Sequence, residues 1–308
     1  LKPGCPRERV AKGPPAKAMS YDAAPAQYFE RPDGAVLAYR IVGGPAPPAR
    51  ACTLLAFNGA YCNTALWRHP ATLWASAGVR CILQDVRGSG MSTAGPLEKG
   101  SGQFTFDRYC EDAAALVQHL GIDKVVVIGM AWGSRPALLF AALFPELCEA
   151  CVLYDLSLGN SLTPEHSGAQ KYSLLLARDK LMRLGGLGEP PSNDKDFNHH
   201  NDQKMAARAM SATSKTPYDN HATFMEVAVD KVACPTLVAM GEFDPNLVAK
   251  EGGARAVVER LRQRLPAAEL HVLEAAGHAS VRTNPLQCAS AALDFLRRSG
   301  VAPAAAAL

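Results

Sequence analysis

The sequence contains no apolar run long enough to cross a membrane, and its net charge is small. A membrane helix needs roughly 18 or more consecutive apolar residues, and no stretch of the chain reaches that length. The N-terminus also lacks the apolar core of a signal peptide. A formal net charge of +3 is too low to indicate a nucleic-acid partner. We therefore expect a cytoplasmic protein without membrane or nucleic-acid partners.

Two common nucleotide-binding motifs are also missing. No G-x-G-x-x-G follows the first strand pattern, which argues against a dinucleotide-binding oxidoreductase. No P-loop sequence is present either. The nine cysteines are an odd number and are scattered through apolar runs, such as those around Cys52, Cys81 and Cys234. We expect them to be buried, reduced thiols, and we expect neither a metal nor an organic cofactor.

The composition that remains is that of a soluble globular protein, with 48% apolar and 20% charged residues. A chain of 308 residues can form one large α/β domain. Residues 1–20 are rich in Pro, Lys, Arg and Ala, and residues 299–308 are mostly Ala and Pro, so we predict a disordered leader and tail. Met19 stands just before structured-looking sequence, and we expect the native start there.

Short apolar patterns typical of strands alternate with helical patterns. The expected strands are 27–30, 36–42, 53–57, 79–83, 124–128, 150–154, 235–240 and 269–273. This alternation predicts a mostly parallel sheet with helices on both faces. Ligands of such sheets bind outside the carboxyl ends of the strands. Asn58, Asp85, Ala131 and Asp155 all fall at those ends.

Residues 157–229 interrupt the alternation. They contain helical patterns but no strand pattern, and the α/β alternation resumes at Cys234. We interpret this segment as a helical lid inserted at the ligand-binding edge of the sheet. The alternative is that it belongs to the ordinary helical shell. In the lid interpretation, the core of the domain comprises residues 21–156 and 230–298.

One strand-turn-helix segment organises the rest of the chain. The β-branched run Val125–Ile128 stops at Gly129, and a helical run begins just after Gly133. Glycines allow a sharp bend and close packing of the helix against the strand. Ala131, at the apex, would stand above a helix N-terminus, which favours negative charge. Alone, the fragment GMAWG is equally compatible with an ordinary strand-to-helix turn.

This segment resembles the G-x-S-x-G nucleophile elbow of the α/β-hydrolases, with Ala131 in place of the serine. DVRGSGMS at 85–92 is similar to the D-x-R-G-x-G-x-S loop of the epoxide-hydrolase, lactonase and haloperoxidase-like members. Asn58-Gly59, GEFDP and AAGHAS complete a set of five motifs in the order of that family. The resemblance implies an eight-stranded, mostly parallel α/β-hydrolase sheet flanked by helices, with a helical lid.

The resemblance also implies catalytic roles. His278 would be the general base, and Asp244 would bond its Nδ1–H and fix its tautomer. Asp155, one strand earlier, is a rival acid; otherwise it would cap the first part of the lid. Asp85 and Arg87 are expected to hold their own loop together.

Backbone and pocket groups follow from the same resemblance. The oxyanion hole would use the backbone N–H of Trp132 and one from the loop of Gly59 and Ala60. The residues expected to bind the substrate are Asn58, Tyr61, Met130, Tyr172 and Leu175.

The apex alanine has no atom that can attack a substrate. Losing such a nucleophile lowers kcat by a factor on the order of 10⁶. Ser134 lies three residues further on, in the first helical turn, where we expect it to cap the helix.

Three explanations remain open. The chain is a serine-to-alanine variant, engineered or natural, of an ester, thioester or lactone hydrolase; or His278 and Asp244 activate water directly; or the fold is a catalytically inactive one that binds a small molecule or partner. We predict acyl hydrolysis of a small, largely apolar molecule, by a monomer or homodimer.

Overall fold

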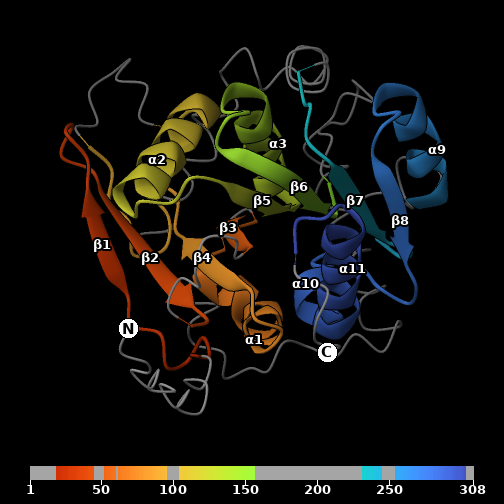
Figure 1. Cartoon of the computed structure of the whole chain (residues 1–308), viewed down its shortest axis with the longest axis horizontal. Helices are drawn as coiled ribbons and strands as arrows, with labels where there is room; N and C mark the ends of the chain where they lie inside the picture. Colours follow the sequence, from red (N-terminus) through yellow and green to blue (C-terminus); the bar gives the residue numbers. More distant parts are fainter. Residues whose placement is uncertain are drawn as a thin grey trace, which may run out of the picture.

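The computed structural model describes residues 19–44, 52–59, 62–95, 104–156, 231–244 and 254–302. Over these ranges the chain forms one eight-stranded sheet with helices on both faces (Figure 1). The expected α/β class and the number of strands are thus confirmed. The predicted lid at 157–229 lies outside the described residues.

The eight strands are four to seven residues long. They are β1 (Gln27–Glu30), β2 (Val36–Val42), β3 (Thr53–Phe57), β4 (Arg80–Gln84), β5 (Val125–Met130), β6 (Cys148–Tyr154), β7 (Thr236–Gly241) and β8 (Glu269–Leu273). Their order across the sheet is β1-β2-β4-β3-β5-β6-β7-β8. β2 is antiparallel to both of its neighbours, β1 and β4, and the remaining pairs are parallel. The carboxyl ends of β3 to β8 therefore share one edge.

Helices cover the two faces in two groups. The described helices are α1 (Arg68–Ser76), α2 (Phe106–His119), α3 (Ser134–Leu143), α9 (Ala254–Arg264), α10 (Ser280–Thr283) and α11 (Pro285–Arg298), with short 3₁₀ helices η1 (Thr64–Trp67) and η2 (Ala131–Gly133). α2, α3 and α9 pack on one face, and α1, α10 and α11 pack on the other (Figure 1).

The central strand β5 shows why the sheet needs both layers. Val125 and Val127 belong to the buried cluster beneath α2 and α3, whereas Val126 and Ile128 belong to the cluster beneath α1 and α11. All four side chains are fully buried. Each such side chain stabilises the fold by about 1.5–3 kcal/mol when it leaves water. A strand buried on both faces is therefore apolar throughout, as the sequence pattern indicates.

The predicted bounds differ little from the observed ones. β1, β2, β3 and β8 have the predicted bounds. β6 begins at Cys148, two residues before the predicted start. A register irregularity, in which Val125 pairs with Cys148 and Val126 pairs with Ala150, adds a residue to this strand.

The cysteines of the described residues are free thiols. No disulfide is present among the described residues, and most of their cysteines are buried. Cys148 and Cys151 form a Cys-x-x-Cys pair at the start of β6, and the Cys148 Sγ lies 3.7 Å from the Cys234 Sγ. In the described part of the chain no group of side chains is arranged to hold a metal ion, and no helix there has the length and apolarity to span a membrane.

Candidate active site

The segment after β5 is a tight elbow with Ala131 at its apex. Ala131 has a φ of +51°, in the left-handed region that side chains other than glycine rarely adopt. Met130 before it is extended, with φ −129° and ψ 129°. Ser134 after it is already helical, with φ −66° and ψ −25°. The chain therefore turns from strand to helix within three residues, as the G-x-A-x-G spacing indicates.

The two glycines of the elbow are required by packing. A Cβ added to Gly133 would lie 2.2 Å from the Asn58 carbonyl oxygen and 2.4 Å from that of Phe57. A Cβ added to Gly129 would lie 2.4 Å from the Gly133 carbonyl oxygen. Real Cβ atoms do not come this close to backbone, so Gly133 lets the elbow sit directly on the end of β3, and Gly129 lets the turn close against its own backbone at Gly133.

Ser134 does not have the capping role predicted for it. Its Oγ donates to the carbonyl oxygen of Tyr154, at 2.9 Å, and the side chain is fully buried. The residue at the cap position is Gly133, which makes no side-chain hydrogen bond. The hydroxyl finds a partner on the neighbouring strand because α3 packs against β6, and it ties the elbow to the end of β6.

Asp244 and His278 meet at the same edge of the sheet, after β7 and β8. The His278 Nδ1 lies 2.8 Å from the Asp244 Oδ2. The Asp244 side chain is 1% exposed and that of His278 is 13% exposed. Because an ionised carboxylate only accepts hydrogen bonds, this contact places a hydrogen on Nδ1 and leaves the lone pair on Nε2.

The backbone holds these two turns against each other. The Phe243 N–H donates to the Ala276 carbonyl oxygen at 2.8 Å, and the Glu242 N–H donates to that of Leu273 at 3.0 Å. A Cβ added to Gly241 would lie 2.4 Å from the Gly277 carbonyl oxygen. The short contact between Asp244 and His278 therefore follows from the packing of the turns and not only from side-chain rotamers.

Asp155 follows β6 and directs its carboxylate at both of these turns. Its Oδ1 accepts from the Gly241 N–H at 3.0 Å, and its Oδ2 accepts from the N–H and the Oγ–H of Ser280, both at 2.8 Å. These contacts favour Asp244 over Asp155 as the partner of His278. The lid residues that Asp155 would cap in the alternative prediction lie outside the described ranges.

The protonation of Asp155 reflects its surroundings. Its side chain is 1% exposed. Burial, and then the nearby charge of Asp244, raise the pKa of Asp155 to about 6, against the opposing effects of His278 and the Ser280 hydrogen bonds.

The DVRGSGMS loop is held by Asp85. Its Oδ1 accepts from the Thr64 N–H at 2.9 Å, and its Oδ2 accepts from the Met91 N–H at 2.9 Å. Gly90 has a φ of +55°, and a Cβ there would lie 2.0 Å from the Asp85 carboxyl group. Burial raises the pKa of Asp85 to about 6, although three hydrogen bonds to the carboxylate oppose the rise. The predicted structural role of Asp85 is confirmed.

Arg87 is a fully buried charge in the same loop. Its Nε and Nη2 donate to Asp112 in α2 at 2.7 and 2.8 Å, and its Nη1 donates to Asp33 at 2.6 Å. Asp33 lies in the β1–β2 turn. Arg87 thus joins its loop to α2 and to that turn through charge-assisted, partly bidentate bonds. Its role is structural, as predicted, but these partners lie outside its own loop.

Asn58 is also committed to the scaffold. Its Nδ2 donates to the Gln84 carbonyl oxygen at 2.9 Å and to Asp85 at 3.1 Å, and its Oδ1 accepts from Trp67 Nε1 at 2.9 Å. The side chain is 2% exposed. These bonds argue against a substrate contact by the Asn58 side chain, which stays a prediction. They fix the backbone that leads into Gly59.

Of the remaining predicted site residues, the structure describes Gly59, Met130 and Trp132. A Cβ added to Gly59 would lie 3.0 Å from the Met130 Sδ, so the end of β5 packs against the Gly59 loop. The Trp132 ring packs on Phe106 and Tyr109 of α2, with centroid separations of 5.3 and 5.7 Å. The predicted residues outside the described ranges are Ala60, Tyr61, Tyr172 and Leu175.

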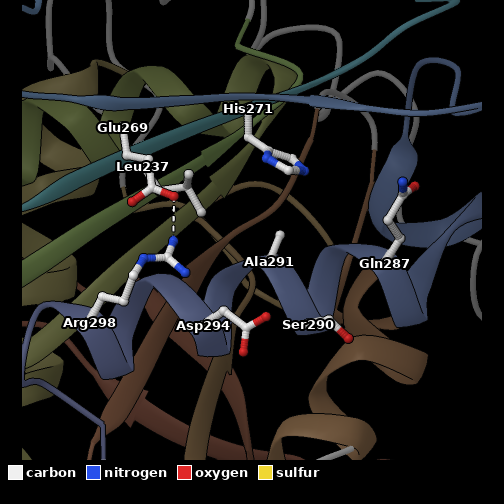
Figure 2. Close-up of a pocket in the computed structure, with 8 residues that line it drawn as sticks. All are labelled: Leu237, Glu269, His271, Gln287, Ser290, Ala291, Asp294 and Arg298. Carbon is white, nitrogen blue, oxygen red and sulfur yellow. Dashed lines mark hydrogen bonds and ion pairs between the residues drawn. The ribbon is translucent and has the colours of Figure 1, made fainter.

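A surface cleft of about 360 Å³ lies away from these residues, between β8 and α11 (Figure 2). Glu269 of β8 and Arg298 of α11 form an ion pair at one end of it. The cleft is lined by Leu237, Glu269, His271, Gln287, Ser290, Ala291, Asp294 and Arg298. None of these residues was predicted to be part of the site, and none belongs to the elbow or the Asp244–His278 pair.

Comparisons with known proteins find similarity to α/β-hydrolases in part of the sequence. A sequence profile of the family described as alpha/beta hydrolase fold matches residues 53–182. A segment of 86 residues is 34% identical to epoxide hydrolase 2 of Siraitia grosvenorii, covering 28% of this chain and 26% of that protein. Epoxide hydrolase B of Mycobacterium tuberculosis is 30% identical over 86 residues, with 28% of this chain and 23% of that protein covered. The matches thus span about a quarter of the length of these relatives.

Solved structures match over most of the chain. A probable hydrolytic enzyme from Pseudomonas aeruginosa superposes with a TM-score of 0.67 at 22% identity, covering 90% of this chain and 96% of that one. A carboxylesterase structure from the thaumarchaeon Nitrososphaera gargenis gives a TM-score of 0.58 at 18% identity, covering 89% of this chain and 99% of that one. At these identities the likeness establishes the fold.

Proposed function

We propose that this chain, which has the α/β-hydrolase fold, is a hydrolase of an ester, lactone or related acyl bond in a small, largely apolar molecule. In this proposal Ala131 occupies the nucleophile position, His278 is the general base and Asp244 orients it. The backbone N–H of Trp132, with one from Gly59 or Ala60, forms the oxyanion hole. The hydrolases among the similar proteins support the reaction class.

The observation that carries the proposal is the hydrogen bond between Asp244 and His278 at the edge that also bears the elbow. Ala131 follows β5 and His278 follows β8, so both stand at the carboxyl edge, and Ala131, Ala276 and Val281 belong to the buried layer on the same face of the sheet. A pocket that only binds a ligand has no need of an oriented base. The combination of an elbow apex with a carboxylate–imidazole pair therefore favours hydrolysis over binding alone.

Because Ala131 has no hydroxyl, the nucleophile in the proposed reaction is a water molecule. A water molecule attacks the acyl carbon and gives a proton to His278 Nε2, while the carbonyl electron pair moves to oxygen. The oxyanion hole stabilises this charge. Collapse of the intermediate restores the carbonyl and expels the alkoxide, which takes the proton back from His278. Enzymes without their nucleophile retain roughly 10³–10⁴-fold acceleration over water.

The alternative function is small-molecule or partner binding by an inactive hydrolase fold. The missing hydroxyl at Ala131 is the observation that favours it. The two functions differ in what His278 does: a hydrolase loses turnover when the imidazole is removed, whereas a binding protein has no turnover to lose.

The test is hydrolysis of a short aryl ester by this chain, by Ala131→Ser and by both with His278→Ala. We expect slow turnover by the parent that His278→Ala abolishes. We expect Ala131→Ser to be faster by at least about 10³-fold, because a nucleophile supplies most of the lost rate. No hydrolysis by either folded protein would contradict the proposal and favour binding.

A second experiment tests whether the substrate is an acyl compound or an epoxide, because several relatives are named as epoxide hydrolases. A carboxylate can also serve as a covalent nucleophile. Ala131→Asp is therefore assayed with an aryl epoxide beside Ala131→Ser with the aryl ester. Higher kcat/KM for Ala131→Asp with the epoxide would show that the acyl-bond assignment is wrong while the site assignment is right.

A further inference from the structure

We propose that Asp155 is a positioning residue that fixes the turn of Asp244 and the turn of His278 relative to each other. The Asp244 turn is residues 241–244, and the His278 turn is residues 274–280. The inference rests on the proposed function in one respect, namely that the positioned pair is catalytic. The geometry of the pair itself is independent of any substrate.

Asp155 reaches each turn at a defined place. Gly241 is the residue at which β7 ends and the Asp244 turn begins, and its N–H donates to the Asp155 Oδ1 at 3.0 Å. Ser280 is two residues beyond His278, and both its N–H and its Oγ–H donate to the Asp155 Oδ2 at 2.8 Å. One carboxylate thus binds three donors from two turns that are far apart in sequence.

The chemistry of the three donors requires a carboxylate. An ionised carboxylate is purely an acceptor, whereas an amide of the same shape brings an NH₂ to one of the two positions. An asparagine at 155 could still accept from the Gly241 N–H through Oδ1, but its Nδ2 would face the Ser280 N–H. An amide would therefore keep its bond to one turn and lose the Ser280 N–H bond to the other, where the Ser280 Oγ alone could still accept from it.

The elbow, the third part of the site, is bonded to the carboxyl end of β6, which Asp155 directly follows. The carbonyl oxygen of Tyr154 accepts from the Ser134 Oγ, which follows the elbow directly. The Tyr154 hydroxyl donates to the Cys288 carbonyl oxygen in α11 at 2.6 Å. Tyr154 and Asp155, two consecutive residues, thus form hydrogen bonds with α3, with α11, with the Asp244 turn and with the His278 turn.

Two further features set Asp155 apart from an ordinary buried hydrogen-bonding residue. Its φ is +45°, a left-handed conformation that aspartate tolerates better than most residues. Its carboxylate is buried beside Asp244, a like charge. Burying a second carboxylate costs stability unless donors satisfy it. Strain and like charge in one place are typical of functional sites.

The first readout is the Nδ1–H proton of His278, followed by proton NMR in this chain with ¹⁵N-labelled histidine. His278→Gln assigns the resonance. We expect Asp155→Asn to speed the exchange of this proton with water by at least about tenfold, because loss of one turn loosens the hydrogen bond that protects it. This readout needs no catalytic activity, so it decides the positioning role even when the proposed function fails.

The second readout is catalysis in the Ala131→Ser background. There we expect Asp155→Asn to lower kcat for the aryl ester by about 10–100-fold with KM within about twofold, since a displaced base affects the transition state more than binding. Arg87→Met is the control: it also removes a buried charge, but away from the pair. Arg87→Met should leave the exchange rate and kcat within about threefold of the parent while folded.

The outcomes are decisive in each case. A folded Asp155→Asn protein with exchange and kcat within about twofold of the parent overturns the proposal. If Asp155→Asn does not fold, Ser280→Ala carries the test, because it keeps the carboxylate and removes a single donor. It should speed exchange by about threefold, and an unchanged rate would overturn the proposal.

Discussion

The turns at the amino ends and at the carboxyl ends of the parallel strands both contain left-handed backbone, but partly different residues adopt it. At the amino ends, the chain enters β4 and β5 through Gly78 and Gly121, which have φ of +84° and +63°. A Cβ at either position would meet nothing within 4 Å. The carboxyl ends also have left-handed glycines, Gly88 and Gly90, but there four described residues other than glycine have positive φ as well, namely Ala131, Asp155, Ala275 and Ala279. Among the described residues, left-handed backbone thus occurs at both ends, but it carries side chains at the carboxyl ends alone.

The difference favours the carboxyl ends, where the proposed active site lies. Glycine adopts a left-handed conformation without strain, so it is the natural choice where a turn has no other task. A residue with a Cβ costs roughly 1–2 kcal/mol in that conformation. At Asp155 this cost is offset, because the carboxylate accepts hydrogen bonds from Gly241 and Ser280. Ala131 has the same strain but no polar group, which is what removal of a functional side chain would leave.

The largest expected effect concerns Arg87 at the carboxyl edge. Arg87→Met should destabilise the protein by about 3–5 kcal/mol, because the buried Asp112 carboxylate loses its bidentate partner, although its ion pair with Arg31 remains. Urea unfolding measures the change. The matched control is Arg262→Met in α9, where the ion pair with Glu259 is largely exposed and the expected loss is under about 0.5 kcal/mol. Equal losses of stability in the two variants would contradict the expected difference between the buried and the exposed arginine.

Glycines at the two ends should respond differently to alanine. Gly133→Ala should cost at least about 3 kcal/mol, because the new methyl group meets the backbone of β3 and no side-chain rotation relieves it. Gly121→Ala should cost only about 1 kcal/mol, from the left-handed backbone alone. Both values come from chemical denaturation. A mild effect of Gly133→Ala would show that the elbow does not sit as tightly on β3 as described.

Stability should vary with pH because of Asp85. Its pKa is raised to about 6 in the fold, so between about pH 4 and pH 6 the native state binds more protons than the unfolded chain. The contribution of Asp85 to stability therefore falls as the pH rises through this range and is constant above it. The stability difference between the parent and Asp85→Asn should shrink by on the order of 2–3 kcal/mol from pH 4 to pH 7. A difference that grows with pH would contradict the assignment.

The smallest effect has the opposite sign. Ala131→Gly should stabilise the protein by about 0.5–1 kcal/mol, because relief of the left-handed strain exceeds the added flexibility of the unfolded chain. Ala137→Gly, in the middle of α3, should instead destabilise it by about 1 kcal/mol. Thermal unfolding of the two variants separates these cases. Destabilisation by both would mean that the apex is not strained.

Local patterns predict much of the fold and part of the site. The strands at 27–30, 53–57 and 269–273 follow from apolar pattern and turn residues, and the structure has them at those bounds. The elbow follows from the spacing of Gly129 and Gly133. These features depend on neighbours in sequence, which is why they can be read without a structure.

The roles that could not be predicted depend on distant contacts. The sequence predicts that Ser134 caps its own helix, but its hydroxyl donates to Tyr154 in β6. Asp155 was interpreted as a rival acid or a cap, because nothing in the sequence shows that Gly241 and Ser280 converge on it. The polar contacts of Asn58 with Trp67 and Asp85 are likewise invisible until the loops are placed.

Covalent labelling with a fluorophosphonate tests most directly whether the carboxyl edge is a serine-hydrolase site that lacks only its hydroxyl. The probe is incubated with the parent, with Ala131→Ser and with Ala131→Ser/His278→Ala, and the adduct is located by peptide mass spectrometry. The account predicts an adduct at position 131 in Ala131→Ser alone. A folded Ala131→Ser protein that stays unlabelled, or one labelled equally without His278, would contradict it.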